Sequence, residues 1–275
     1  MRRALALCLG LVLVACGQSQ QPAAQQSPPA IRFAQATDQT RLQHGERLAL
    51  VLGCRGCHGR NLQGQPWEED ANLAISFSSN LTRALPAYSD AALERAIRQG
   101  IRLDGSLLWG MPSEIFAQLD PADLAALIAY LRTWPPAGEV HPRIVFGPQG
   151  RREVAAGNYK PASVLVRQTR GQGPVRFDAA HDQARYMIRA TCAECHGLTI
   201  TGRPGEDGHR GPPDLNVAGA YTREDFRRLM RTGVASGGRQ VGLMSQVARN
   251  RFSHFTDAEV DAIYDYLVAR ARRPQ

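Results

Sequence analysis

The sequence predicts an all-α protein that consists of two similar helical halves. Three observations lead to this prediction. The segments CRGCHG (54–59) and CAECHG (192–197) repeat one C-x-x-C-H pattern, each follows an amphipathic helix-like stretch, and helix start and stop signals recur at matching places after both. At 275 residues the chain has room for two ordinary domains. We therefore interpret the sequence as an internal duplication.

The amino terminus is typical of an export signal. MRR precedes an apolar run, ALALCLGLVLVA, that is too short for a ~20-residue membrane span but suits a signal peptide core. The run ends in Leu-Val-Ala-Cys, which resembles the lipobox of bacterial lipoproteins. We expect a signal peptide over residues 1–15 and a lipid anchor at Cys16, on the periplasmic side of a bacterial membrane. The alternative is an ordinary signal peptide that happens to contain a cysteine. Residues 16–37, rich in Gln, Pro and Ala, predict a flexible tether.

The formal net charge is +8, and Lys160 is the only lysine, so arginine carries almost all of the positive charge. A basic excess occurs in proteins that bind nucleic acid, anionic lipid or acidic proteins, and it also serves general solubility. Nothing else in the sequence indicates nucleic acid. We expect no nucleic-acid partner.

The cysteines are the most informative residues. The chain has six of them, namely Cys8, Cys16, Cys54, Cys57, Cys192 and Cys195. Two lie in the leader and four in the C-x-x-C-H motifs, so none remains for a separate disulfide or a catalytic thiol. Two thiols three residues apart suit a zinc ligand pair, a redox dithiol or an attachment point.

The histidine that follows each pair favours attachment of haem. Cysteines at i and i+3 of one helical turn project from the same side and can bond both vinyl groups along one haem edge. The next residue, His58 or His196, then turns its imidazole toward the iron. A zinc site made of four thiolates would not need these histidines, and a thioredoxin-like motif would need a βαβ context that is missing.

The elements around the two motifs correspond in order. The stretches RLQHGERLALVLG and HDQARYMIRAT lead into the motifs, and glycine-punctuated loops at 59–64 and 197–202 follow them. The segments SNLT, with Asn80, and PDLN, with Asp214, come next. We therefore expect each half to have a second loop, at Asn80 or at Asp214, before its next helix.

Two further helices complete each half. The first of them begins at the N-caps Ser89 and Thr222 and ends at Gly100 and Gly233. The last helix opens with Asp120-Pro121 in one half and with the capping box Thr256-x-x-Glu259 in the other. Its apolar face in the two halves consists of Leu124, Leu127, Ile128 and Leu131, and of Val260, Ile263, Tyr264 and Leu267.

Both halves resemble bacterial class I cytochrome c domains, which we place at residues 38–137 and 177–275. The resemblance implies two tandem small helical folds, each around one covalently bound haem c, with residues 138–176 as a linker. It also implies a distal methionine between the second and last helices. Met111 follows Gly100 at the same offset as Met244 follows Gly233.

The expected site residues are those of the two motifs and the two methionines. They are Cys54, Cys57, His58 and Met111 in the first half, and Cys192, Cys195, His196 and Met244 in the second. The second half lacks the proline that follows Met111, so His254 and His209 remain alternative ligands there. Met230 aligns with Ile97, which favours ordinary packing.

Three other histidines, His44, His141 and His181, are expected at the surface or near the haem propionates. Trp109 is expected in the packing of the first haem pocket. In the linker, residues 144–146 and 163–166 suit short strands or chain packed across the domain junction. Arg143, Arg151 and Arg152 suit either propionate partners or solvated side chains.

Function follows from closed coordination of the two irons. Iron held by histidine and methionine has no vacant site for substrate, so we expect a single-electron carrier and no catalytic residue. The donor would be a dehydrogenase or quinol-oxidising complex, and the acceptor an oxidase or reductase. The alternatives are a cytochrome subunit of a dehydrogenase, or a dihaem enzyme such as a peroxidase or thiosulfate dehydrogenase. The last of these needs a cysteine ligand that the chain lacks.

Overall fold

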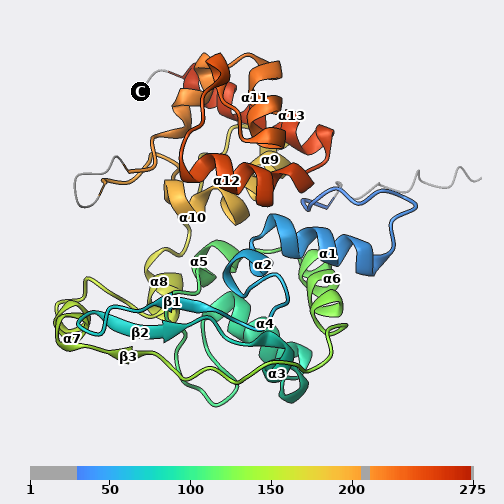
Figure 1. Ribbon diagram of the computed structural model, residues 1–275. Coiled ribbons are helices and arrows are strands. Elements are labelled where there is room, and N and C mark those ends of the chain that lie inside the picture. Colours follow the sequence, from blue (N-terminus) through green and yellow to red (C-terminus); the bar gives the residue numbers. More distant parts are fainter. Residues whose placement is uncertain (1–29, 206–210, 274–275) are drawn as a thin grey trace, which may run out of the picture. The chain divides into compact units, whose positions relative to one another are not determined.

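The computed structural model describes residues 30–205 and 211–273 and is mainly helical, as the sequence predicts (Figure 1). The expected signal peptide, Cys16, most of the expected tether and His209 lie outside the described residues. Within the part of the chain that is described, no helix is long and apolar enough to cross a membrane.

The first half contains short helices in the predicted order. They are α1 (Arg41–Val51), α2 (Cys54–Cys57), α3 (Leu81–Ala84), α4 (Asp90–Gln99), α5 (Ser113–Phe116) and α6 (Pro121–Leu131), with a 3-10 turn η1 (Leu85–Ala87). The predicted caps form: the side chain of Ser89 accepts from Ala92 N at the start of α4, and that of Asp120 accepts from Ala122 N at the start of α6. Each satisfies an N–H that a helix start leaves unpaired.

Helices α1 and α6 cross at close range on the side of the first half that lies away from the strands (Figure 1). Gly45 permits the approach, because a Cβ at this position would lie 2.1 Å from the carbonyl oxygen of Ala126. Leu48 and Leu127 are buried in the same apolar cluster. The crossing therefore gives a fixed base from which the next turn, α2, begins.

The second half repeats this order. Its helices are α9 (Asp182–Thr191), α10 (Ala193–His196), α11 (Arg223–Thr232), α12 (Leu243–Asn250) and α13 (Asp257–Ala271), with the 3-10 turns η2 (Ala179–His181), η3 (Leu215–Ala220), η4 (Ser236–Gly238) and η5 (Phe252–His254). The Thr222 cap and the Thr256–Glu259 capping box form as predicted. Helix α13 packs against α9, as α6 packs against α1.

The segment at 138–176 folds onto the first half. Residues Val145–Phe146 form β3, which pairs antiparallel with β2 (Ala74–Phe77), and β2 pairs with β1 (Pro66–Glu68). The helices α7 (Pro148–Ala155) and α8 (Ala162–Gln168) follow. This small three-stranded sheet is an addition to the helical fold that the sequence predicts.

A short strand at residues 163–166 was one of two expectations, and it is wrong because these residues lie in the helix α8. The strand forms in the other expected segment, at residues 145–146. Helix α8 packs against α4 and α5, and its first residue lies close to the end of α4. Gly100 ends α4 in the left-handed region (φ 68°), and a Cβ there would lie 2.5 Å from the Cβ of Ala162. The apolar residues of α8 thus cover the first half rather than a domain junction.

His44 corrects another expectation, because it is buried at 2% exposure and not at the surface. Its Nε2 lies 2.9 Å from Oδ1 of Asp123, which is also buried. The hydroxyl of Tyr186 and the backbone N–H of Phe33 donate to Oδ2 of the same carboxylate, at 2.8 and 3.0 Å. Burial and the charge of Asp123 hold the pKa of Tyr186 well above its usual value, so the hydroxyl stays a donor. This network connects the two halves.

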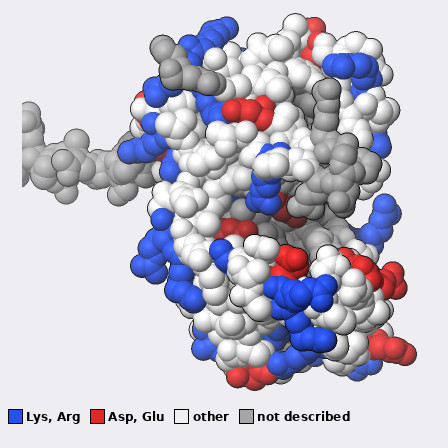
Figure 2. All heavy atoms as spheres, turned by 90° about the vertical axis from the view of Figure 1, so that its left-hand side faces the viewer, with Lys and Arg blue, Asp and Glu red and all other residues white. Residues whose placement is uncertain are grey.

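The charged side chains of the surface are mixed in sign. On the face drawn in Figure 2, Lys and Arg are interspersed with Asp and Glu and with uncharged residues. Several arginines are paired, such as Arg223 with Asp265 and Arg227 with Asp261. This distribution agrees with a general solubility role for the net positive charge.

Candidate haem sites

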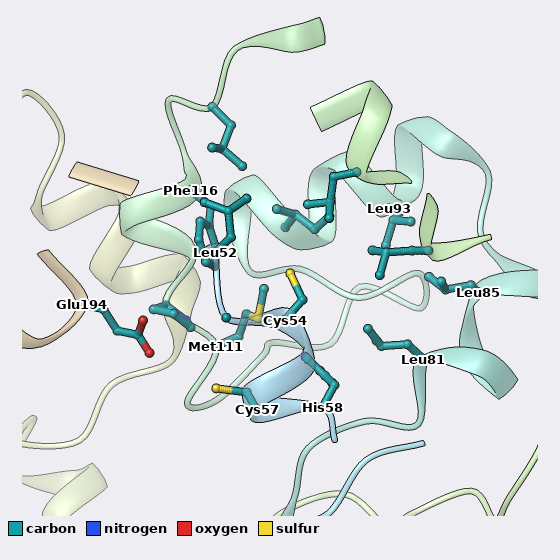
Figure 3. Close-up of a pocket in the computed structure, with 16 residues that line it drawn as sticks. Leu52, Cys54, Cys57, His58, Leu81, Leu85, Leu93, Met111, Phe116 and Glu194 are labelled. Atoms are coloured by element: carbon teal, nitrogen blue, oxygen red, sulfur yellow. The ribbon is translucent and has the colours of Figure 1, made fainter. Parts of the chain in front are cut away.

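The first C-x-x-C-H motif is held at the end of α1. Gly53 turns the chain with a left-handed φ of 81°, and α2 then carries Cys54 and Cys57 on one helical turn. Cys54, Cys57, His58 and Met111 all line one cavity (Figure 3). The structure therefore brings together the four predicted site residues of the first half.

The walls of this cavity are apolar. They include Leu81, Leu85, Leu93 and Ile97 from the α3 to α4 region, and Phe116, Leu127 and Leu131 from α5 and α6 (Figure 3 labels Leu81, Leu85, Leu93 and Phe116). A second cavity of about 310 Å³ adjoins it and shares Cys57, His58, Met111 and Pro112. A flat apolar ring with reactive groups on one edge fits such walls, because apolar surface leaves water when it binds.

The adjoining cavity is more polar. Arg83, Arg102 and Arg143 line it, together with His141. Haem carries two propionate groups, and guanidinium groups suit carboxylates. Arg143 is the only one of the three linker arginines considered above that lines this cavity, and it also pairs with Asp104. His141 is half-buried and stacks on Phe77, with ring centroids 5.0 Å apart.

Each motif histidine is oriented by one backbone carbonyl. Nδ1 of His58 lies 2.8 Å from the carbonyl oxygen of Ser79, and Nδ1 of His196 lies 2.7 Å from that of Pro213. Donation from Nδ1 leaves Nε2 with a free lone pair for a metal. Burial lowers the pKa of both imidazoles, which favours the neutral form that binds iron.

The second half builds an equivalent cavity of about 390 Å³. Cys192, Cys195, His196 and Met244 line it, and Phe226, Met230, Ile263 and Leu267 add apolar walls. Met230 is nearly fully buried on α11 and, like Ile97 in the first half, it packs against the cavity. His254 is exposed in η5 and is absent from the residues that line the cavity.

The four thiols are free, and burial is the main cause that raises the pKa of each. The pKa of Cys54 rises to about 12 and that of Cys192 to about 11. A redox dithiol of the thioredoxin kind needs a lowered thiol pKa, so these environments disfavour it. Among the residues described, no group of three or more His, Cys, Asp or Glu side chains is arranged to hold a metal ion.

Some residues of the sites could not be predicted from the sequence. Nothing in the sequence marks the carbonyl groups of Ser79 and Pro213, although the aligned residues Asn80 and Asp214 directly follow them. Tyr159, from the linker, lines the polar cavity and stacks on Trp109, with ring centroids 5.4 Å apart. No local pattern marks Tyr159, because its role depends on how residues 138–176 fold back.

Two protein families match the chain, one in each half. Residues 40–131 match the family described as "Cytochrome C oxidase, cbb3-type, subunit III", and residues 183–270 match the family described as "Cytochrome c". Each match includes one complete C-x-x-C-H motif and one of the two methionines, Met111 or Met244. The fold, the repeated sites and these matches define a c-type cytochrome.

Individual relatives agree on this class. The "Fructose dehydrogenase cytochrome subunit" of Gluconobacter japonicus is 24% identical, over 82% of this chain and 52% of its own length. The "Alcohol dehydrogenase (quinone), cytochrome c subunit" of Gluconacetobacter polyoxogenes is 25% identical, over 84% and 56%. The "Diheme cytochrome c-type" of Cereibacter sphaeroides is 26% identical, over 97% and 98%.

The chain spans about half the length of the dehydrogenase subunits among these relatives. It matches the dihaem protein over nearly the full length of both. The chain is a bacterial dihaem c-type cytochrome with two covalently bound haem c groups.

Proposed function

We propose that this cytochrome carries single electrons from an exported dehydrogenase to a later acceptor such as an oxidase or reductase, and that it is not itself an enzyme. One observation carries the proposal. Both cavities are lined by a C-x-x-C-H motif and by one methionine at the predicted place, Met111 or Met244. Histidine and methionine together close the coordination of an iron and leave no position for a substrate.

In this proposal the chain's residues hold and enclose the two groups. Cys54 and Cys57, and likewise Cys192 and Cys195, would form the thioether bonds to one haem each, and His58 and His196 would bind its iron through Nε2. The carbonyl groups behind the two imidazoles keep each ring in one tautomer. The leucine-rich walls exclude water from the centre. Bound haem supplies one-electron chemistry.

The names of the relatives support a dehydrogenase as the electron donor. The proteins concerned are cytochrome subunits of fructose, alcohol and gluconate dehydrogenases. Our proposal is a separate carrier rather than a fixed subunit, and its support is the likeness to the "Diheme cytochrome c-type" protein.

Carbon monoxide tests the closed coordination directly. We expect the purified, reduced protein to show no change in its Soret band under carbon monoxide, because both distal positions are filled by sulfur. The measurement is a visible difference spectrum at neutral pH, with reduced myoglobin as the positive control. A haem that binds carbon monoxide would contradict a pure carrier and favour the peroxidase alternative.

We further propose that the mature chain begins at a lipid-modified Cys16 and is held on the periplasmic side of a membrane. The support is the apolar run that ends in Leu-Val-Ala-Cys, followed by a polar tether. Each buried methylene of an acyl chain contributes ~0.8 kcal/mol, so several chains would anchor the protein firmly.

Replacement of this cysteine tests the anchor. Cys16→Ser is expected to release the cytochrome from the membrane fraction or to block its processing, because serine cannot form the thioether to lipid. Fractionation with detection of covalent haem measures the effect, and Cys8→Ser, within the removed leader, is the matched control. Unchanged membrane association of the Cys16 variant, with an amino terminus elsewhere, would contradict lipidation.

A further inference from the structure

An ion pair lies between the two haem-attachment turns. Glu194 belongs to the second C-x-x-C-H motif, yet it lines the cavity of the first half together with Cys54 and Cys57 (Figure 3). Arg251, just after α12, lines the cavity of the second half. Its Nη1 donates to Oε2 of Glu194 at 2.7 Å. One charge pair therefore borders both cavities.

The first half is shaped to receive Arg251. Nε of Arg251 donates to the carbonyl oxygen of Val51 at 3.2 Å, where α1 ends. Gly53 leaves the space for the guanidinium, because a Cβ there would lie 2.7 Å from Cζ of Arg251. The side chain of Arg251 is 12% exposed and that of Glu194 is 23% exposed. The ion pair between Arg251 and Glu194 is thus largely buried, and residues of the first half hold Arg251 in place.

The guanidinium of Arg251 has one N–H group, at Nη2, that is buried and not hydrogen-bonded to any of the described residues. Glu194 lines the cavity with Cys54 and Cys57, and Arg251 lines the cavity with Cys192 and Cys195, so the pair lies close to both attachment sites.

We propose that Arg251 and Glu194 set the reduction potentials of both haem groups together. Reduction adds one negative charge to a haem, so the nearby guanidinium favours the reduced form and the nearby carboxylate favours the oxidised form. Screening by water is weak at a largely buried pair. Loss of the Arg251 charge should therefore lower both reduction potentials, and loss of the Glu194 charge should raise both. The inference rests on haem attachment at both motifs, as in the proposed function.

The test is a redox titration of four variants of the full-length, haem-loaded protein. Arg251→Gln should lower the equilibrium constant for reduction of each haem about tenfold, which is ~59 mV for a one-electron couple. Glu194→Gln should raise each by a similar factor. The double variant should return both to within about twofold of wild type, because it removes the pair as a neutral unit. Arg251→Lys keeps the charge and should stay within about twofold as well.

Arg47 provides the matched control. It pairs at 2.8 Å with Glu259 across the same two halves, its side chain is 13% exposed, and it lies outside the residues that line the three cavities. Arg47→Gln should leave both potentials as in wild type. The proposal is overturned if Arg251→Gln changes the potentials no more than Arg47→Gln, or if Arg251→Gln and Glu194→Gln shift only one haem.

Haem content separates this inference from the proposed function. Two haem groups per wild-type chain, found by pyridine haemochrome assay, confirm that both motifs are loaded. Fewer than two would overturn the proposed function and the inference together. If Arg251→Gln fails to fold, Glu194→Gln and Arg251→Lys decide the outcome: a rise of both potentials in the first and none in the second supports the pair, and any other result refutes it.

Discussion

Replacing Met244 by His is expected to lower the reduction potential of the second haem by a large part of the ~0.8 V range that axial ligands control. The iron would remain six-coordinate, but a nitrogen donor would replace the thioether sulfur and stabilise the oxidised form. The first haem should change little, because Met111 and His58 are untouched. Ferric spectra should lose about half of the weak long-wavelength band that arises from methionine–iron charge transfer.

Two variants make this result specific. Met111→His should produce the corresponding fall in the potential of the other haem. Met230→Leu changes the second methionine of the same cavity without offering a ligand, and it should leave both potentials near wild type. Spectroelectrochemical titration resolves the two haem groups. If Met244→His leaves the potentials and the band unchanged, another residue is the ligand, and Met230 and His254 are the next to test.

The geometry supports Met244, although its setting differs from that of Met111. Met111 precedes α5 and is followed by Pro112, whereas Met244 lies in the first turn of α12, after Gly242 with a φ of 58°. The two methionines are both half-buried and both face a cavity with a C-x-x-C-H motif. The different loop is thus compatible with the same role.

The features that the sequence predicted well depend on residues close together in the chain. Helix starts at Ser89, Thr222 and Thr256 follow from side chains that reach N–H groups three residues ahead. The C-x-x-C-H motifs likewise fit within a single helical turn. Such signals are local, so periodicity and spacing were enough to find them.

The features that the sequence did not reveal depend on distant residues. His44 looks like a surface residue until Asp123 is brought beside it by the crossing of α1 and α6. Arg251 shows no motif, and its importance arises because Val51 and Glu194 lie around it. Burial of a charged or polar group depends on partners that only the tertiary structure supplies.

Asp123→Ala is expected to reduce the free energy of unfolding by about 3–5 kcal/mol. The carboxylate is 1% exposed and accepts from Tyr186 and from the backbone N–H of Phe33, besides its contact with His44. Alanine would leave these three groups buried without their acceptor, and each lost partner adds a desolvation cost. Urea unfolding of the haem-loaded protein, followed by circular dichroism, measures the change.

The position of Asp123 also predicts which parts of the protein the Asp123→Ala variant weakens. Its partners lie in α1, in the segment before α1 and in α9, so the variant should weaken the link between the halves as well as the first half itself. Asp120→Ala is the matched control on the same helix. It removes only the cap on Ala122 N and should cost about 1 kcal/mol. Equal losses in the two variants would contradict the buried network, since a solvated Asp123 would leave no partner stranded when it is removed.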